Sequence, residues 1–363
     1  MRILFRYVLR EFLVPFCYCL IGFIGIYVMF ELFNSFSRLM EAKPGTWTVV
    51  SFFAGYLSPY LKWLIPAALL LATLYTMWNF CRHSEITAMR ASGIGFSAIV
   101  SPLLFMAFLM AFGVAALDEF YVPDAAEWAK DFRQARFRHV DANVYSNIPY
   151  YNQQQRRIWR VDKLDGRNPH VLEGVTISVD RPDGSREVDI ASKKAEFLDG
   201  EWWLHYPQYQ YFDEIGNPIP NPMPAITNLV FRAFPDFNES PRDFLLMNKP
   251  WEYYSTRDQI QYLRQNPNVS DYSSKIFDVH AKLAMPFSCL IITLFAIPFG
   301  VATGRQSVFK GVIWAVGLFF AFYAVHILCM ILAKNGHIPP APAAWTANAV
   351  FLVVGLCLFW RQR

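Results

Sequence analysis

The apolar residues of this chain are gathered into blocks near its two ends, and this segregation constrains the fold more than any other feature. Each block has about the length that an α-helix needs to cross roughly 30 Å of hydrocarbon. Hydrophobic residues make up 54% of the chain, more than soluble domains usually carry. The sequence therefore predicts a membrane protein with six transmembrane helices, at about 12–33, 57–80, 96–117, 281–302, 308–333 and 341–360.

The middle of the chain, residues 118–279, carries most of the charge and is predicted to be a domain outside the membrane. The third helix is expected to continue through 123–137. Short runs rich in β-branched and aromatic residues then alternate with turn signals such as Asp165-Gly166 and Asp199-Gly200. The expected strands are 156–164, 171–180, 186–192, 193–198 and 201–212, and a return helix is expected at 255–265.

These patterns predict an α+β membrane protein with a β-sandwich or jelly-roll inserted between helices three and four. The expected parts are 1–117, 118–279 and 280–363. All six cysteines lie in or beside apolar runs, so the middle domain needs no disulfide.

The basic residues of the short loops predict how the chain is oriented. A secretory signal peptide is not expected at the N-terminus, because the apolar run is long enough to span and no small-residue cleavage site follows it. By the positive-inside rule both termini and the loop 81–95 are cytoplasmic, and 118–279 lies on the far side. The cytoplasmic set is Arg2, Arg6, Arg10, Arg82, Arg90, Arg305, Lys310, Arg361 and Arg363, against Arg38, Lys43 and Lys334 opposite.

The loop 81–95, CRHSEITAMRASGIG, separates two apolar runs and must face water because of its charges. Ser84 is expected to cap the start of a short helix over 85–92, and Gly93 to cap its end in the left-handed conformation. On that helix one side carries an apolar centre with basic edges, formed by His83, Ile86, Met89 and Arg90. Such a face suits a soluble partner, and an ordinary solvated loop is the alternative.

The sequence offers no machinery for catalysis. Gly300 and Gly304 are followed by Arg305, so the phosphate-binding G-x-x-x-x-G-K-[ST] motif is absent and the chain is not expected to hydrolyse nucleotide. The scattered histidines and the lack of Cys-x-x-Cys predict no zinc site. No catalytic residue, metal or cofactor is therefore expected, and the small net charge of +4 gives no sign of nucleic-acid binding.

Isolated polar and aromatic groups allow two interpretations each. His326, Glu31 and Lys62 lie in or near membrane runs, and a hydrogen-bonded or snorkelling side chain is favoured over a proton relay. Arg38 and Lys43, at the far end of the first helix, are either solvated or placed to meet phosphates. Aromatic residues alternate around one strand, which leaves open a filled core or a groove for acyl chains; they are Trp202, Trp203, Tyr206, Tyr209, Tyr211 and Phe212.

Three stretches resemble the LptF/LptG permease family of the lipopolysaccharide-export machine: SEITAMRASGI (84–94), HAKLAMPF (280–287) and NGHIPPAPAAW (335–345). The resemblance extends over nearly the whole chain. It implies six helices with a periplasmic β-jelly-roll between helices three and four, in the bacterial inner membrane. The 363-residue length and the stretch 31–45 are slightly more similar to the G-type than to the F-type subunit.

The resemblance also implies site residues and partners. In the family, the helix after membrane helix two docks on a cytoplasmic ATPase dimer (LptB-like), a role that transfers to Ser84, Glu85, Ile86, Met89, Arg90 and Gly93. Helices 12–33 and 308–333 match gates to a cavity shared with a second permease subunit. Arg38 and Lys43 match residues that contact substrate phosphates, as a sparser set than some members have. The jelly-roll would pass the lipid to a similar domain (LptC, then LptA) by strand pairing.

The expected function is thus a non-catalytic permease subunit that extracts lipopolysaccharide with energy from a separate ATPase. A secondary transporter or lipid sensor that works without ATP is the alternative, distinguished by whether an ATPase co-purifies. An envelope enzyme with a catalytic β-domain ranks last, because His139, His170 and His205 have no recognisable nucleophile–base spacing.

Overall fold

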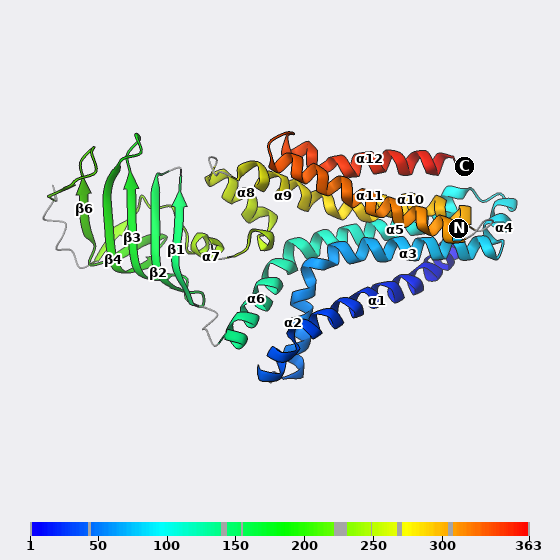
Figure 1. Ribbon diagram of the computed structural model, residues 1–363, viewed down its shortest axis with the longest axis horizontal. Coiled ribbons are helices and arrows are strands. Elements are labelled where there is room, and N and C mark those ends of the chain that lie inside the picture. Colours follow the sequence, from blue (N-terminus) through cyan, green and yellow to red (C-terminus); the bar gives the residue numbers. More distant parts are fainter. Residues whose placement is uncertain are drawn as a thin grey trace. The chain divides into compact units, whose positions relative to one another are not determined.

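The structure is a computed structural model that describes residues 2–42, 45–138, 144–153, 155–220, 231–247, 249–266, 271–303 and 308–361. The chain forms two compact units (Figure 1). The first contains Met1–Ala129 and Asp271–Arg363, and the second contains Lys130–Ser270.

The first unit is helical, and the apolar runs explain why. Among the described residues, six helical stretches are long and apolar enough to cross a membrane, which confirms the predicted number: Ile3–Phe36, Thr46–Arg82, Phe96–Arg133, Tyr272–Val301, Gly311–Lys334 and Pro340–Trp360. The helices are α1 (Arg2–Ala42), α2 (Thr46–Leu57), α3 (Leu61–Arg82), α4 (Glu85–Ala91), α5 (Phe96–Ala116), α6 (Val122–Arg138), α9 (Tyr272–Ala284), α10 (Ser288–Thr303), α11 (Val308–Lys334) and α12 (Pro340–Trp360).

The first membrane stretch begins at Ile3 and not near residue 12, and two others begin earlier than predicted because a helix continues through a proline-containing break. Pro59 lies in the short 3₁₀ turn Ser58–Tyr60 between α2 and α3, and Pro286 in the turn Met285–Phe287 between α9 and α10. Proline has no N–H to donate, so the α-helical ladder is interrupted at both points. The predicted extension of the third helix is confirmed: α5 passes through a π-helical turn, Leu117–Tyr121, into α6.

The break before α10 frees a backbone carbonyl, and a buried amide satisfies it. The N–H of Ser288 bonds to Met285 and Pro286 instead of to the Ala284 carbonyl. The Asn348 side chain of α12 donates to that carbonyl with an N–O distance of 2.7 Å. An unpaired carbonyl costs several kcal/mol in hydrocarbon, so this bond stabilises the kinked helix and joins it to α12.

A close approach of α10 to α3 at Gly300 requires glycine. A Cβ atom at Gly300 would lie 2.6 Å from Met77 Cβ and 3.3 Å from the Leu74 carbonyl oxygen. We expect Gly300→Ala to lower the unfolding free energy by about 1–3 kcal/mol, because these neighbours cannot yield without moving a helix. Thermal unfolding of the detergent-purified chain measures this. Gly317→Ala is the matched control, since a Cβ there meets nothing within 4 Å; equal melting temperatures would contradict the packing argument.

The second unit contains an antiparallel sheet with the order β1-β2-β3-β4-β5-β8, in which β6 also pairs with β4 and β7 pairs with β6 (Figure 1). The strands are β1 (Val144–Asn152), β2 (Arg157–Asp165), β3 (Val171–Asp180), β4 (Arg186–Leu198), β5 (Glu201–His205), β6 (Gln208–Phe212), β7 (Pro218–Ile219) and β8 (Phe231–Phe234). The predicted antiparallel sheet is confirmed. The pairing does not specify a jelly-roll, which stays a prediction.

Several boundaries differ from the expected ones. The segments 186–192 and 193–198 form one strand, β4, whereas 201–212 is divided into β5 and β6. Strands β1 and β8 and helix α7 (Pro241–Met247) were not predicted. The return helix is confirmed as α8 (Thr256–Gln265), where Ser255 Oγ accepts the backbone N–H of Asp258 at 3.1 Å. The turn at Asp199-Gly200 is also confirmed, with φ of 54° and 87°, the two positive values that a type I′ hairpin turn needs.

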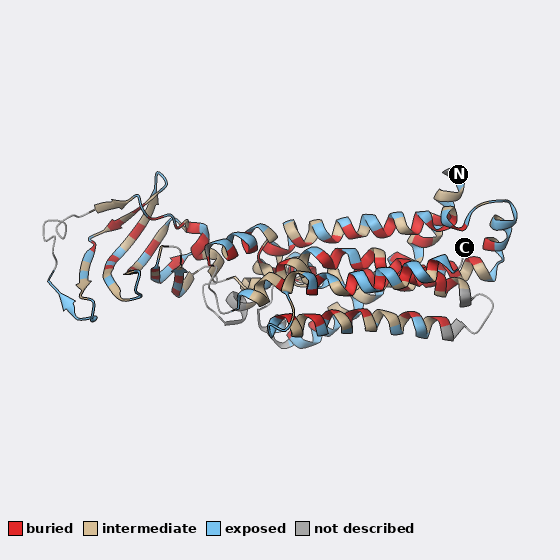
Figure 2. Cartoon of the chain, turned by 90° about the horizontal axis from the view of Figure 1, so that it is seen from above, coloured by how far each residue is buried: buried red, intermediate tan, exposed pale blue. Residues whose placement is uncertain are grey.

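One face of the sheet is packed with large side chains, so its interior is filled in this structure. Trp159, Val161, Ile177, Trp202 and Leu204 are all fully buried, and burial alternates along the strands (Figure 2). Phe237 and Phe244, from the segment after β8, lie against Trp159 with ring centroids 5.3 and 5.2 Å away. Core packing therefore accounts for the aromatic residues of this face.

Candidate functional site

The short helix α4 is stabilised at its two ends in different ways. Ser84 precedes it with φ of 57°, and its side chain makes no capping hydrogen bond, so the predicted Ser84 cap is wrong. The turn closes through the backbone, where Ser84 N–H donates to the Cys81 carbonyl at 3.1 Å. The predicted Gly93 cap is confirmed: its φ is 85°, its N–H donates to the Arg90 carbonyl, and Ile94 N–H reaches the Met89 carbonyl at 3.1 Å.

The apolar side of α4 faces the membrane helices and not the solvent. Ile86 is only 6% exposed and belongs to a buried cluster with Val8, Phe80 and Phe96. Met89 packs against the same cluster. The expectation that Ile86 forms the apolar centre of an open face is therefore wrong, because hydrophobic burial holds it inside.

The surface that α4 does offer is small and basic. Its exposed residues are Thr87, Ala88, Arg90 and Ala91. Arg82 and His83, also exposed, precede the helix, and the Arg82 guanidinium lies 5.3 Å from the centroid of Trp78. In the helical unit the two chain ends and α4 lie at the same end (Figure 1).

Glu85 has a partner that the sequence did not indicate. Tyr7 of α1 donates its hydroxyl proton to Glu85 Oε2 at 2.8 Å. The Tyr7 ring also stacks on Phe80 of α3, with centroids 5.8 Å apart. Because Tyr7 and Glu85 are 78 positions apart, no local pattern could have connected them.

Helix α1 is held by the other helices mainly near its N-terminus. Val8, Phe12 and Phe16 are buried there, and no described residue between Phe16 and Glu31 is buried. Large apolar side chains farther along are open, such as Phe33 at 73% exposed. Glu31 is buried and accepts a hydrogen bond from Ser35 Oγ at 2.8 Å, in accord with a satisfied polar group.

The expected phosphate-contacting pair is not tested by the structure. The backbone of Arg38 forms part of α1, but its side chain is not among those that the structure describes. Lys43 lies outside the described residues. His326 is buried in α11 with its ring 5.8 Å from that of Phe277. Among the described residues no group of three His, Cys, Asp or Glu side chains is placed to hold a metal.

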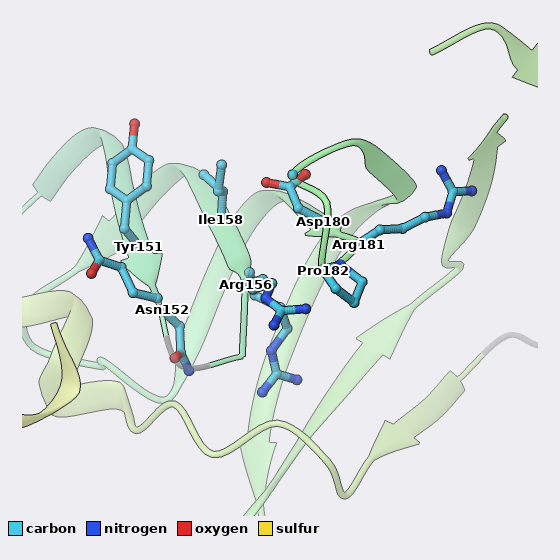
Figure 3. A pocket seen from close by; sticks show the side chains of 10 residues that line it. Tyr151, Asn152, Arg156, Ile158, Asp180, Arg181 and Pro182 are labelled. Atoms are coloured by element: carbon cyan, nitrogen blue, oxygen red, sulfur yellow. The ribbon is translucent and has the colours of Figure 1, made fainter. Parts of the chain in front are cut away.

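The second unit has a hollow of about 300 Å³ between the turn after β1 and the β3–β4 hairpin (Figure 3). Tyr151 and Ile158 stand on its neighbouring strands, and Asp180 lies across from them. Two of its arginines serve the fold: Arg157 contacts Glu239, and Arg181 donates to the carbonyls of Phe212 and Asp213. Among the described residues, the ten that line the hollow include no Ser, Cys or His.

The described histidines of the β-domain, His170 and His205, contact an aromatic ring and a carboxylate. His205 Nε2 lies 3.4 Å from Glu196 Oε2, and hydrogen bonding from Lys194 is the main cause that lowers the pKa of Glu196. His170 stacks on Phe197. His139 lies outside the described residues. In the described part of the domain these contacts are a partly buried His205–Glu196 pair and the stacking of His170 on Phe197.

These features define a multi-pass membrane protein of the α+β class, with an antiparallel sheet between its third and fourth membrane helices. A family model described as "Lipopolysaccharide export system permease LptF/LptG" matches residues 6–361. The chain therefore belongs to the LptF/LptG family, the non-catalytic permeases of lipopolysaccharide export. No curated protein matches the chain in a sequence comparison.

Proposed function

We propose that this chain is a permease subunit of an ATP-binding-cassette exporter, which extracts lipopolysaccharide from the outer leaflet of the bacterial inner membrane. The family match over residues 6–361 carries the proposal. Because the sequence lacks a nucleotide-binding motif, the energy comes from a separate cytoplasmic ATPase dimer. The chain pairs with a second permease subunit of the same type and delivers the lipid to a periplasmic bridge protein.

The ATPase docks on the loop that contains α4. The contacts of α4 indicate which of its residues hold the helix on the membrane helices and which face the partner. Ile86 and Met89, which pack against the membrane helices, hold the helix in place. Glu85 and Arg90 offer charge to the partner, while Ser84 and Gly93 set the two ends of the helix. A short helix held on a packed bundle transmits a push from the partner better than a free loop does.

The remaining parts of the proposal concern the route of the lipid. The termini and α4 are cytoplasmic, and the β-domain is periplasmic. Helices α1 and α11 border the shared cavity; the exposed apolar surface of both supports this, with Phe33 at 73% and Phe320 at 66% exposed. Arg38 and Lys43 contact the substrate phosphates, and a sheet edge of the β-domain pairs with the bridge.

Reconstitution into proteoliposomes tests the proposal. The purified chain is expected to hydrolyse no ATP alone, and to release lipopolysaccharide to the bridge protein only together with its partner permease, the ATPase and ATP. Glu85→Ala is expected to reduce release while leaving membrane insertion intact. Lipid movement by the chain without any ATPase would overturn the proposal and favour a secondary transporter.

A further inference from the structure

The hydrogen bond between Tyr7 and Glu85 joins α4 to the N-terminal part of α1. We propose that Tyr7 is a positioning residue that orients Glu85 and passes displacements of α4 directly to α1. This inference rests on the proposed function, because it assumes that a partner moves α4. It adds a named contact through which that movement reaches a helix bordering the lipid path.

The Tyr7–Glu85 contact lies next to the part of α1 that is buried against the other helices. The buried residues of its first part, Val8, Phe12 and Phe16, follow Tyr7 directly along the helix. The next described buried residue is Glu31, about four turns beyond Phe16. A displacement applied near Tyr7 therefore acts close to the most buried part of a long helix, whose remaining length contacts the other helices through partly buried side chains such as Leu20, Phe23 and Tyr27.

The Tyr7–Glu85 hydrogen bond can persist while Glu85 binds a partner. Tyr7 occupies one carboxylate oxygen, Oε2, and a carboxylate can accept several hydrogen bonds. A guanidinium or ammonium group of the partner can bind the remaining acceptor positions without displacing Tyr7. Stacking on Phe80 fixes the direction of the Tyr7 ring, so the hydroxyl remains pointed at Glu85.

Tyr7→Phe separates the hydroxyl from the rest of the side chain. The ring and its stacking on Phe80 remain, and only the hydrogen bond to Glu85 is lost. In the reconstituted complex we expect the lipopolysaccharide released per ATP hydrolysed to fall by about three- to tenfold, the range for losing an ordinary hydrogen bond, because the Tyr7–Glu85 bond is exposed to solvent. Tyr75→Phe of α3 is the control, because Tyr75 is 51% exposed, lies outside the helices that border the lipid path, and its loss of a hydroxyl is expected to change nothing.

A double-mutant cycle distinguishes this role from a general effect on stability. If Tyr7 acts through Glu85, adding Tyr7→Phe to Glu85→Ala causes no further loss of lipopolysaccharide released per ATP hydrolysed. Glu85→Gln keeps an oxygen that can accept the Tyr7 hydroxyl, so in that background Tyr7→Phe still lowers the release ratio. An unchanged release ratio in Tyr7→Phe, or losses that simply multiply in the double variant, would overturn the inference while the proposed function stands. Release without ATP by the wild-type complex would overturn both.

Discussion

Replacing Ile86 with Asp is expected to reduce ATP-driven lipopolysaccharide release by more than about tenfold, because burying an unpaired charge costs several kcal/mol. Ile86 is 6% exposed within an apolar cluster that includes Val8, Phe80 and Phe96. Helix α4 has only seven residues and depends on this packing, since so short a helix is not stable alone. The variant helix therefore leaves its position, and the membrane helices, which have their own contacts, remain folded.

Two measurements separate this local effect from loss of the protein. Binding of the ATPase to the detergent-purified chain is expected to fall together with release, while the amount of inserted chain is unchanged. Ile86→Leu is the matched control, because a swap that conserves volume usually costs less than about 1.5 kcal/mol and keeps the cluster filled. Full ATPase binding by Ile86→Asp would contradict the assignment of Ile86 as the anchor of α4.

The membrane helices were predictable because a single quantity, the length of an apolar run, sets them. The same criterion missed Thr46–Leu57, which is apolar but too short to span the bilayer alone. Only its continuation through the turn Ser58–Tyr60 into α3 makes it part of a spanning stretch. In the sheet, the expected strands were divided at Lys193, yet β4 continues to pair with β3 as far as Glu196, while the buried positions shift from Ile190 and Ser192 to Ala195.

The position of the helix α4 in the sequence was predictable, but the side of it that packs against the membrane helices was not. Helical spacing put Ile86, Met89 and Arg90 on one side, and Gly93 at the end, from local pattern alone. Which side faces the bundle depends on the buried cluster that Ile86 joins, which includes Val8 and Phe96 from other helices. The link to Tyr7 likewise exists only after α1 and α3 have packed together.

Breaking the buried ion pair of the β-domain is expected to have the other large effect. The Glu239 side chain is fully buried, and its Oε1 atom lies 3.3 Å from Arg157 Nε and accepts Asn152 Nδ2 at 2.7 Å. Arg157 also donates to the Asp236 carbonyl at 3.0 Å and lies over the Phe237 ring at 4.4 Å. Burial lowers the pKa of Arg157, and the negative charge of Glu239 opposes that shift.

Glu239→Ala leaves the buried guanidinium without its counter-charge, and we expect the domain to lose about 3–5 kcal/mol of unfolding free energy. The segment 234–247 should loosen first, because it places Phe237 and Phe244 over Trp159. Hydrogen exchange of the full chain, followed peptide by peptide, should show faster exchange in that segment and in β2.

The β-domain provides a matched control for this prediction. Glu173 pairs with Lys163 at 3.3 Å on the surface, where both side chains are more than half exposed. Because exposed pairs contribute only about 0–1 kcal/mol, Glu173→Ala should leave exchange almost unchanged. The double variant Arg157→Met/Glu239→Leu should recover part of the loss, since it removes the orphaned charge and fills the space with apolar atoms. Equal exchange rates in Glu239→Ala and Glu173→Ala would contradict this prediction. They would mean that the aromatic contacts alone hold the segment 234–247 against the sheet and that the Arg157–Glu239 ion pair does not stabilise it.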